Sequence, residues 1–298
     1  MSLVEQTIAR LKKTQVGVGA TSAPREPTPI DRSPHRAAPI VVDERFEDTT
    51  SLVKPIVLDN TALRARGYFP EPDRDRQFAD QYRRIKRPLI DRALSGGITL
   101  GEPRVIVVTS ALPGDGKTFT SINLTFSMAL ERDVSVLLID SDVAKRHVSE
   151  IFGLERRAGL LDALVDESLD AESLIVPTTT RGFSILSAGN RVSGTAELLS
   201  SNRMRMIVTE LCARNPRRIV LLDSPPLLVT NEGAALVKIA GQVVLVVRAR
   251  QTPRQAVRAA VALFDAQQAG GLVLNEVQGG THEGYYGYGS YGSDDDQV

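Results

Sequence analysis

The stretch Arg104–Thr118, RVIVVTSALPGDGKT, decides the fold. Its first seven residues form a short run rich in β-branched side chains, which predicts a buried β-strand. Ala111–Thr118 then has the form of a phosphate-binding loop, with Ala111 in place of the usual first glycine. Apolar residues recur at helical spacing from the loop to about Leu130. A strand, a glycine-containing loop and a helix in this order are the context in which the motif binds phosphate.

The loop supplies the groups that a nucleotide requires. Gly114 and Gly116 let backbone amides turn toward phosphate oxygens, and the following helix N-terminus adds partial positive charge. Lys117 is placed to reach the β- and γ-phosphates, and the Thr118 hydroxyl to bind Mg²⁺. A glycine turn with a chance lysine is the alternative, which both spacing and context disfavour. The predicted nucleotide-binding residues of the loop are Pro113, Gly114, Asp115, Gly116, Lys117, Thr118 and Phe119.

Further apolar runs predict more strands, at residues 134–142, 217–226, 242–250 and 271–277. Helical stretches lie among them, at residues 200–215, 231–240 and 253–268. Thr252 before Pro253 predicts the N-cap of the last helix. Because the runs are continuous rather than alternating, both faces of the sheet should be buried. The predicted class is α/β, a P-loop NTPase-like, mainly parallel sheet with helices on both faces, which binds ligands at the carboxyl ends of its strands.

Acidic residues stand at two of these strand ends. Asp140 and Asp223 each end an apolar run, and Asp142 follows Asp140 by two residues. Three carboxylates at one edge would repel one another without a cation, and Mg²⁺ supplies one. A turn or helix-cap role is the alternative for Asp140 and Asp142. For Asp223 the metal role is preferred, because the following Ser-Pro-Pro stiffens the strand end.

Composition excludes several classes of protein. The 36 lysines and arginines balance the 36 aspartates and glutamates, so no global field favours nucleic acid or an anionic membrane. Cys212 is the single cysteine, which excludes an internal disulfide and a multi-cysteine metal site, and it is expected in the core. No apolar run has membrane-spanning length, and the N-terminus lacks the apolar core of a signal peptide. We therefore expect a cytoplasmic protein.

The N-terminal third divides into distinct segments. Residues 1–13, MSLVEQTIARLKK, carry one apolar stripe and predict a short amphipathic helix. Residues 14–73 are rich in Pro, Ser, Thr and charge, which predicts a flexible linker. Its apolar island, residues 51–59, is a candidate to pack on the domain. The domain itself is predicted at 74–280, and a disordered tyrosine-rich tail at 281–298.

A basic helix is predicted at Asp75–Leu94, with apolar residues at helical spacing along one face. The other face carries Arg83, Arg84, Lys86 and Arg87. A solvated face and a phosphate- or partner-binding face fit this pattern about equally. Pro88 is expected to kink or break the helix.

The C-terminal stretch GYYGYGSYGSDDDQV holds four of the six tyrosines of the chain: Tyr285, Tyr286, Tyr288 and Tyr291. Tyrosine normally buries its ring, but no apolar run here offers a core. A low-complexity tail with adhesive tyrosines is one interpretation. A phosphoryl-donor loop and a row of phenolic acceptors in one chain favour the other, a tyrosine autokinase.

Three segments carry a family resemblance: residues 110–118 (SALPGDGKT), 136–146 (VLLIDSDVAKR) and 219–233 (IVLLDSPPLLVTNEG). They resemble the Walker A, A′ and B motifs of bacterial tyrosine kinases, and the tyrosine-rich C-terminus is also typical of that family. Residues 1–13 and 81–90 (QYRRIKRPLI) resemble more closely the exosortase-associated tyrosine autokinases of exopolysaccharide systems. The resemblance covers about Asp75 to the end of the chain and the first helix.

The resemblance implies residue roles. The loop, through Gly114, Gly116, Lys117 and Thr118, would bind the phosphates of ATP and Mg²⁺. Asp140 would help to activate the acceptor hydroxyl. Asp142 and Asp223 would organise the metal and its waters. Asn275 falls where related ATPases contact adenine.

The resemblance also implies partners. Tail tyrosines would be phosphorylated between neighbours in a ring-shaped homo-oligomer. A membrane-bound polysaccharide co-polymerase would be a separate partner, through which the kinase would reach the inner membrane and regulate exopolysaccharide synthesis or export.

The sequence departs from the family pattern at two places. Ala144 occupies the place of a frequent arginine, and the oligomerisation motif of one glutamate and two arginines is matched only by Asp80, Arg83 and Lys86.

Two other functions remain open. The partitioning and septum-site ATPases share the fold, and in them water accepts the phosphate. Their signature lysine stands where this chain has Leu112, which counts against that class. The second alternative is a non-catalytic regulator that binds nucleotide and acts through its N-terminal helix and tail.

Overall fold

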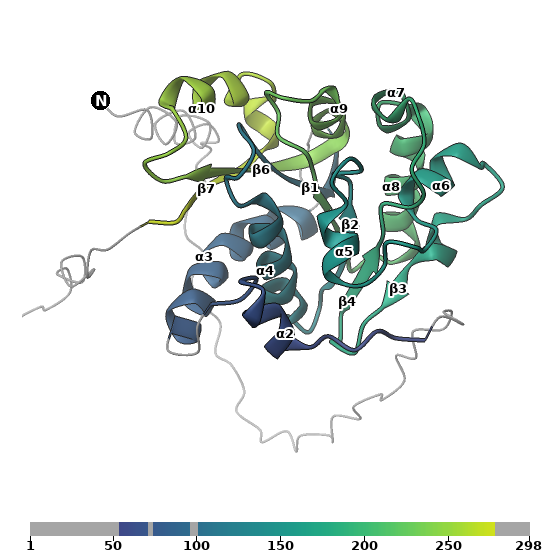
Figure 1. The fold of residues 1–298 in the computed structure, drawn as a ribbon, viewed down its shortest axis with the longest axis horizontal. Coiled ribbons are helices and arrows are strands. Elements are labelled where there is room, and N and C mark those ends of the chain that lie inside the picture. The colour runs from purple at the N-terminus through teal and green to yellow at the C-terminus, as the bar shows by residue number, and fades with distance from the viewer. Residues whose placement is uncertain (1–53, 71–73, 96–100, 278–298) are drawn as a thin grey trace, which may run out of the picture. The chain divides into compact units, whose positions relative to one another are not determined.

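The computed structural model describes residues 54–70, 74–95 and 101–277 (Figure 1). The predicted N-terminal helix, most of the predicted linker and the four tail tyrosines lie outside these residues. Every described residue belongs to one unit of the chain, Asp48–Val298. None of the helices in the described part is long and apolar enough to cross a membrane.

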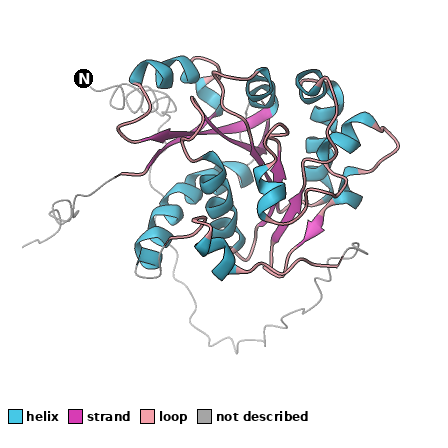
Figure 2. Ribbon diagram, in the orientation of Figure 1, coloured by secondary structure: helices cyan, strands magenta, loops and turns pink. Residues whose placement is uncertain are grey.

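The centre of the fold is a seven-stranded sheet with the order β3-β4-β2-β5-β1-β6-β7 (Figures 1 and 2). The strands are β1 (Glu102–Ser110), β2 (Ser135–Asp140), β3 (Val176–Pro177), β4 (Phe183–Leu186), β5 (Arg218–Asp223), β6 (Ala240–Arg248) and β7 (Ala269–Asn275). All neighbouring pairs are parallel except β3 and β4. The predicted α/β class with a mainly parallel sheet is confirmed.

Helices cover both faces of this sheet. They are α2 (Asn60–Ala65), α3 (Asp75–Leu94), α4 (Lys117–Ala129), α5 (His147–Ile151), α6 (Leu160–Val165), α7 (Thr195–Leu199), α8 (Asn202–Arg214), α9 (Asn231–Ile239) and α10 (Arg254–Val261), with short 3-10 turns η2 (Ala171–Leu174) and η3 (Ala266–Gln268). Buried residues of α3, α4 and α5 join one hydrophobic cluster, and those of α6 to α10 join the other.

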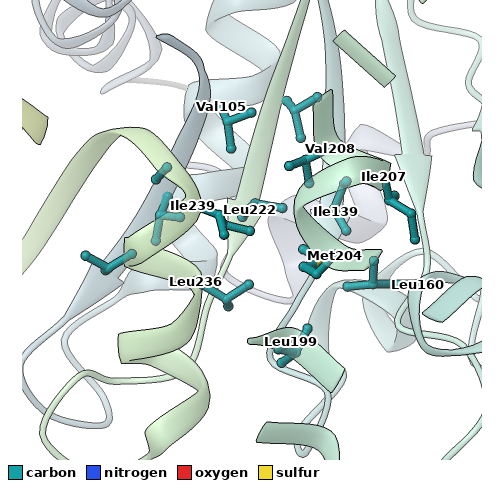
Figure 3. Packing of buried hydrophobic residues seen from close by; sticks show 14 of the residues in the cluster. Val105, Ile139, Leu160, Leu199, Met204, Ile207, Val208, Leu222, Leu236 and Ile239 are labelled. Carbon is teal, nitrogen blue, oxygen red and sulfur yellow. The ribbon is translucent and has the colours of Figure 1, made fainter. Parts of the chain in front are cut away.

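Alternate residues of each central strand enter opposite clusters, which explains the continuous apolar runs. Val105 of β1 lies in the cluster that contains residues of α8 and α9 (Figure 3). The next residue, Ile106, lies in the cluster that contains residues of α3 and α4. Both are completely buried. Cys212 of α8 is also buried in the first cluster, as expected.

The region between β2 and α8 holds elements that no sequence pattern predicted. Helices α5, α6 and α7 are five or six residues long, too short for periodicity to be recognised. Strand β4 has four residues and pairs with β2, so it extends the sheet beyond the predicted strands.

Pro88 was predicted to kink or break the basic helix. It does not break the helix, because α3 runs without interruption from Asp75 to Leu94, and a kink stays a prediction. Proline removes only one backbone donor, and tertiary packing offsets that loss on both sides of the residue. Tyr82 precedes Pro88 and Leu89 follows it, and both are buried against the core.

Lys86 does not lie on a solvated basic face. Its ammonium donates to the carbonyl oxygen of Ser127 and pairs with Glu131 at 2.8 Å, and its side chain is buried. Lys86, the third residue of the incomplete oligomerisation motif, therefore makes its polar contacts within this chain. Arg83 of the same motif pairs with Asp80 on the surface.

The prediction that residues 14–73 form a linker with little fixed structure is wrong for residues 54–70. Asp59 caps α2 by accepting hydrogen bonds from the amides of Thr61 and Ala62, and Leu63 is buried. Ile56 forms a parallel bridge with Thr178 beside β3. The expectation that this apolar island packs on the domain is confirmed.

Helix α10 differs from its prediction at both ends. It stops at Val261 rather than continuing to Gln268, and residue Pro253 occupies the N-cap position. Thr252 is therefore not the N-cap. Its hydroxyl is engaged by Asp115 of the phosphate-binding loop instead.

Candidate functional site

The phosphate-binding loop, Ala111–Thr118, connects β1 to α4 as predicted. Gly116 has a φ of 96°, a left-handed conformation that side chains other than glycine rarely adopt. A Cβ atom built there would lie 2.0 Å from Nδ2 of Asn275. Glycine at this position is thus required by both the backbone turn and the packing of the loop.

Lys117 begins α4 and is only 6% exposed. Burial lowers the pKa of its amine, although the nearby carboxylates of Asp223 and Asp142 act in the opposite direction. A buried ammonium is costly unless negative charge accompanies it. Phosphate groups bound in the loop would supply that charge.

The Asp223 carboxylate at the end of β5 is fully buried and accepts two hydroxyl hydrogen bonds. Thr118 Oγ1 donates to Oδ2 at 2.8 Å, and Ser121 Oγ donates to Oδ1 at 2.8 Å. Burial raises the pKa of Asp223 to about 6, although these two hydrogen bonds oppose the shift. Sequence reasoning missed Ser121, whose only signal is its place three residues after Thr118 on the same helix.

The Asp140 carboxylate at the end of β2 is buried and only partly satisfied. Its Oδ2 accepts from the amide of Ser149 at 2.7 Å and from its hydroxyl at 2.6 Å. Its Oδ1 has no hydrogen-bond partner among the described residues. Burial raises the pKa of Asp140 to about 7, with Asp223 adding to the rise and Ser149 opposing it. A carboxyl that titrates near neutrality is suited to accept a proton.

Asp142 serves the turn after β2. Its backbone carbonyl accepts from the amides of Lys145 and Arg146, and its Oδ1 accepts weakly from Lys145 at 3.3 Å. The turn role considered for the Asp-Ser-Asp stretch is therefore present at Asp142. Its side chain is nevertheless close enough to Lys117 to raise the pKa of that amine.

Sheet register explains why the acidic residues meet. Asp140 and Asp223 are direct partners across the parallel pair β2–β5, so their side chains leave the same edge of the sheet. We call Asp140, Asp142 and Asp223 the acidic cluster. Asp142 and Asp223 both raise the pKa of Asp140, which places the three carboxylates within electrostatic reach of one another.

The acidic cluster does not form a closed protein cage for a metal. Within the described residues, no group of three or more His, Cys, Asp or Glu side chains is arranged to hold an ion. Mg²⁺ does not require such a cage, because it retains several waters and binds one or two carboxylates together with substrate phosphates. The unpartnered Oδ1 of Asp140 fits that arrangement as an acceptor for a metal-bound water.

The other predicted loop residues occupy different surroundings. Asp115 is buried, Pro113 is exposed, and Phe119 packs its ring edge-on against Phe78. Asn275 at the end of β7 donates from Nδ2 to the Asp115 carbonyl oxygen at 3.1 Å. Asn275 therefore lies against the loop, and contact with adenine stays a prediction.

Comparisons with known proteins agree with this geometry. A family model described as an AAA domain matches residues 103–268. The tyrosine-protein kinase YwqD of Bacillus subtilis is 31% identical over 217 residues, which cover 70% of this chain and 86% of that protein. The tyrosine-protein kinase wzc of Salmonella typhimurium is 30% identical over 64% of this chain, and the match spans only 27% of that longer protein.

Two solved kinase domains share the architecture. The VpsO kinase domain has a TM-score of 0.55 and 26% identity, covering 70% of this chain and 100% of that domain. The kinase domain of the Escherichia coli tyrosine kinase ETK has a TM-score of 0.52 and 26% identity, covering 61% and 72%.

Proposed function

The chain belongs to the bacterial tyrosine-protein kinases, and from this premise we propose that it is an ATP- and Mg²⁺-dependent autokinase of its own C-terminal tyrosines. The proposed acceptors are Tyr285, Tyr286, Tyr288 and Tyr291. One observation carries the proposal: the acidic cluster, Lys117 and Thr118 converge at one edge of the sheet, with Thr118 Oγ1 2.8 Å from Asp223 Oδ2.

The proposed reaction is an in-line phosphoryl transfer. A phenol oxygen forms a bond to the γ-phosphorus as the bond to the β,γ-bridging oxygen breaks, and ADP leaves. The loop amides and Lys117 neutralise charge on the phosphates. Asp140 accepts the phenolic proton, a role supported by its raised pKa and its unpartnered Oδ1.

Thr118, Asp142 and Asp223 would hold Mg²⁺ or its waters. When bound, Mg²⁺ supplies charge neutralisation at the β- and γ-phosphate oxygens. Because Asp223 already accepts two hydroxyl hydrogen bonds, it would act on the metal through an intervening water.

We further propose that the acceptor tail belongs to a neighbouring copy in a homo-oligomer. Each phosphate adds about 1.5 to 2 negative charges to a tail that already carries Asp294, Asp295 and Asp296. Repulsion from the acidic cluster would then expel the tail, so phosphorylation should shift the protein from oligomer toward monomer. Light scattering before and after ATP treatment measures this shift. Equal mass in both states would contradict the switch but not the kinase activity.

The biological setting follows from the family resemblance. The proposed partner is a membrane polysaccharide co-polymerase, the proposed process is regulation of exopolysaccharide synthesis or export, and the proposed location is the cytoplasm, at the inner membrane when partnered. Co-purification with a co-polymerase encoded in the same cell would support this setting.

Mass spectrometry of the C-terminal peptide after incubation with ATP and Mg²⁺ tests the activity. We expect several phosphotyrosines on this peptide in the wild type. Replacing all four tail tyrosines by Phe should remove nearly all phosphate incorporation into the protein and preserve ATP binding. Phosphate found mainly on Tyr68 or Tyr82 would contradict the tail as substrate. Release of free phosphate with none on the protein would instead support an ATPase.

A further inference from the structure

The acidic residue of the phosphate-binding loop, Asp115, is held from several directions. It is 3% exposed, and its Oδ2 accepts from the amide of Leu112 within the loop at 3.2 Å. Its Oδ1 accepts from the hydroxyl of Thr252 at 2.8 Å, and its backbone carbonyl accepts from Asn275 at 3.1 Å. Both carboxylate oxygens of Asp115 are thus engaged by hydrogen-bond donors of the protein itself.

Thr252 is well placed to fix this residue. The same hydroxyl that donates to Asp115 accepts from the amide of Arg248 at 2.9 Å, so its orientation is determined on both sides. Arg248 ends β6, a strand that pairs with β1 on one side and with β7 on the other. The Asp115 carboxylate is therefore connected to the end of β6 through one oriented hydroxyl, that of Thr252, which is distant from the loop in sequence.

The neighbouring backbone supports the same arrangement. Arg250 and Glu276 both adopt positive φ values, 63° and 54°, which are uncommon for residues other than glycine. The amide of Ala249 donates to the carbonyl of Asn275 at 2.9 Å, and Arg248 pairs with Glu276 at 2.6 Å. Unusual backbone conformations persist where surrounding contacts fix them and tend to cluster at functional sites.

We infer that Thr252 is a positioning residue for the phosphate-binding loop, and that it acts through Asp115. By fixing the buried carboxylate, Thr252 holds the loop in its nucleotide-binding conformation before the nucleotide arrives. Such preorganisation improves affinity by reducing the ordering that binding requires. The inference rests on the proposed function, because it assigns Thr252 to the same nucleotide site.

Calorimetric titration of ADP into the full chain, together with autophosphorylation kinetics, tests the inference. Thr252→Val should raise the Kd for ADP about tenfold, the scale expected when a buried charged group loses one hydrogen bond. It should raise KM for ATP similarly and leave kcat unchanged, and Thr252→Ser should restore the wild-type values. Thr209→Val is the matched control, because Thr209 Oγ1 also makes a hydrogen bond but lies exposed on α8.

A double-mutant cycle tests the route through Asp115. Thr252→Val should add nothing to the Kd of Asp115→Ala, because the two residues act through one interaction. An unchanged Kd in Thr252→Val, additive effects, or failure of both Thr252→Val and Thr252→Ala to fold would overturn the inference. A wild type that binds no ADP would overturn the nucleotide site itself, which separates failure of the proposed function from failure of this inference.

Discussion

Asp115 in the phosphate-binding loop and Asp140 at the end of β2 are both buried carboxylates, but their oxygens are satisfied to different extents. Both oxygens of Asp115 accept hydrogen bonds from fixed donors. Only one oxygen of Asp140 does, and the other lies buried without a partner among the described residues. A buried acceptor that lacks a partner costs roughly 1–3 kcal/mol.

The difference separates two tasks at one edge of the sheet. On the loop side both oxygens of Asp115 are hydrogen-bonded, which suits a loop that must keep its shape while phosphates bind. The acidic side retains unused hydrogen-bonding capacity and raised pKa values, at Asp140 and Asp223, which suits proton transfer and metal binding. We therefore expect mutations on the loop side to weaken nucleotide binding and mutations on the acidic side to slow transfer.

The largest effect on autophosphorylation is expected at Lys117, which belongs to the phosphate-binding loop and also lies near the acidic cluster. Lys117→Met should reduce autophosphorylation about a thousandfold, because a charge that stabilises the transition state is lost. The fold should persist, since methionine has a similar length and removes a buried charge. Phosphotyrosine measured by mass spectrometry, with circular dichroism as the folding control, checks this. Normal phosphotyrosine in the folded variant would show that the loop is not the donor site.

Asp140→Asn should slow transfer about a hundredfold, because an amide cannot accept the phenolic proton. ADP affinity should change little, since the hydrogen bonds of the Asp140 carboxylate among the described residues go to Ser149 and not to the loop. Single-turnover kinetics separates the chemical step from binding. If the rate is normal, Asp140 has only the structural task of holding Ser149 at the start of α5.

Gly116→Ala should weaken ADP binding about tenfold, because a left-handed backbone disfavours side chains by roughly 1–2 kcal/mol. The added methyl group would also displace Asn275, whose Nδ2 lies 2.0 Å from the position of the new Cβ. Gly67→Ala is the matched control: Gly67 also has a positive φ, but a Cβ there meets nothing within 4 Å. Equal ADP affinity in the two variants would contradict a packing role for Gly116.

The smallest effect is on the pH dependence of the free energy of unfolding, measured in protein freed of nucleotide and metal. Burial raises the pKa of Asp140 from 3.8 to about 7, so the folded state retains a proton that the unfolded chain releases. The stability associated with this group is fully present below pH 3.8 and is lost as the pH rises to about 7. Across that window the free energy of unfolding should fall more in the wild type than in Asp140→Asn, by an amount on the order of a kcal/mol. Parallel curves from urea denaturation would exclude this contribution.

Local rules were sufficient to predict where four candidate site residues lie in the fold. Lys117 and Thr118 follow from the loop motif, and Asp140 and Asp223 from apolar runs whose ends must meet in a parallel sheet. The supports of these residues depend on tertiary packing instead. Thr252 meets Asp115 across 137 positions of the chain. Its place before Pro253 predicted that Thr252 would be the N-cap of α10, but its hydroxyl donates to Asp115 instead.

Dependence on tertiary packing also explains the errors in the predicted fold. Helical spacing placed Lys86 on a polar face, but only the position of α4 reveals that the lysine reaches Ser127 and Glu131. Strand β4, with four residues, gains its stability from pairing with β2 rather than from its own sequence. Composition predicted a linker as far as residue 73, yet Asp59 caps α2 and Leu63 of that helix is buried in the core, and these contacts depend on tertiary packing.

Comparing Asp140→Asn with Thr252→Val in one experiment tests the division of tasks most directly. The ADP Kd and the single-turnover rate of tail phosphorylation at saturating ATP would be measured for both variants. We predict that Asp140→Asn retains the Kd and loses the rate, whereas Thr252→Val loses affinity and retains the rate. The reverse pattern, or equal losses of both quantities in both variants, would contradict the account.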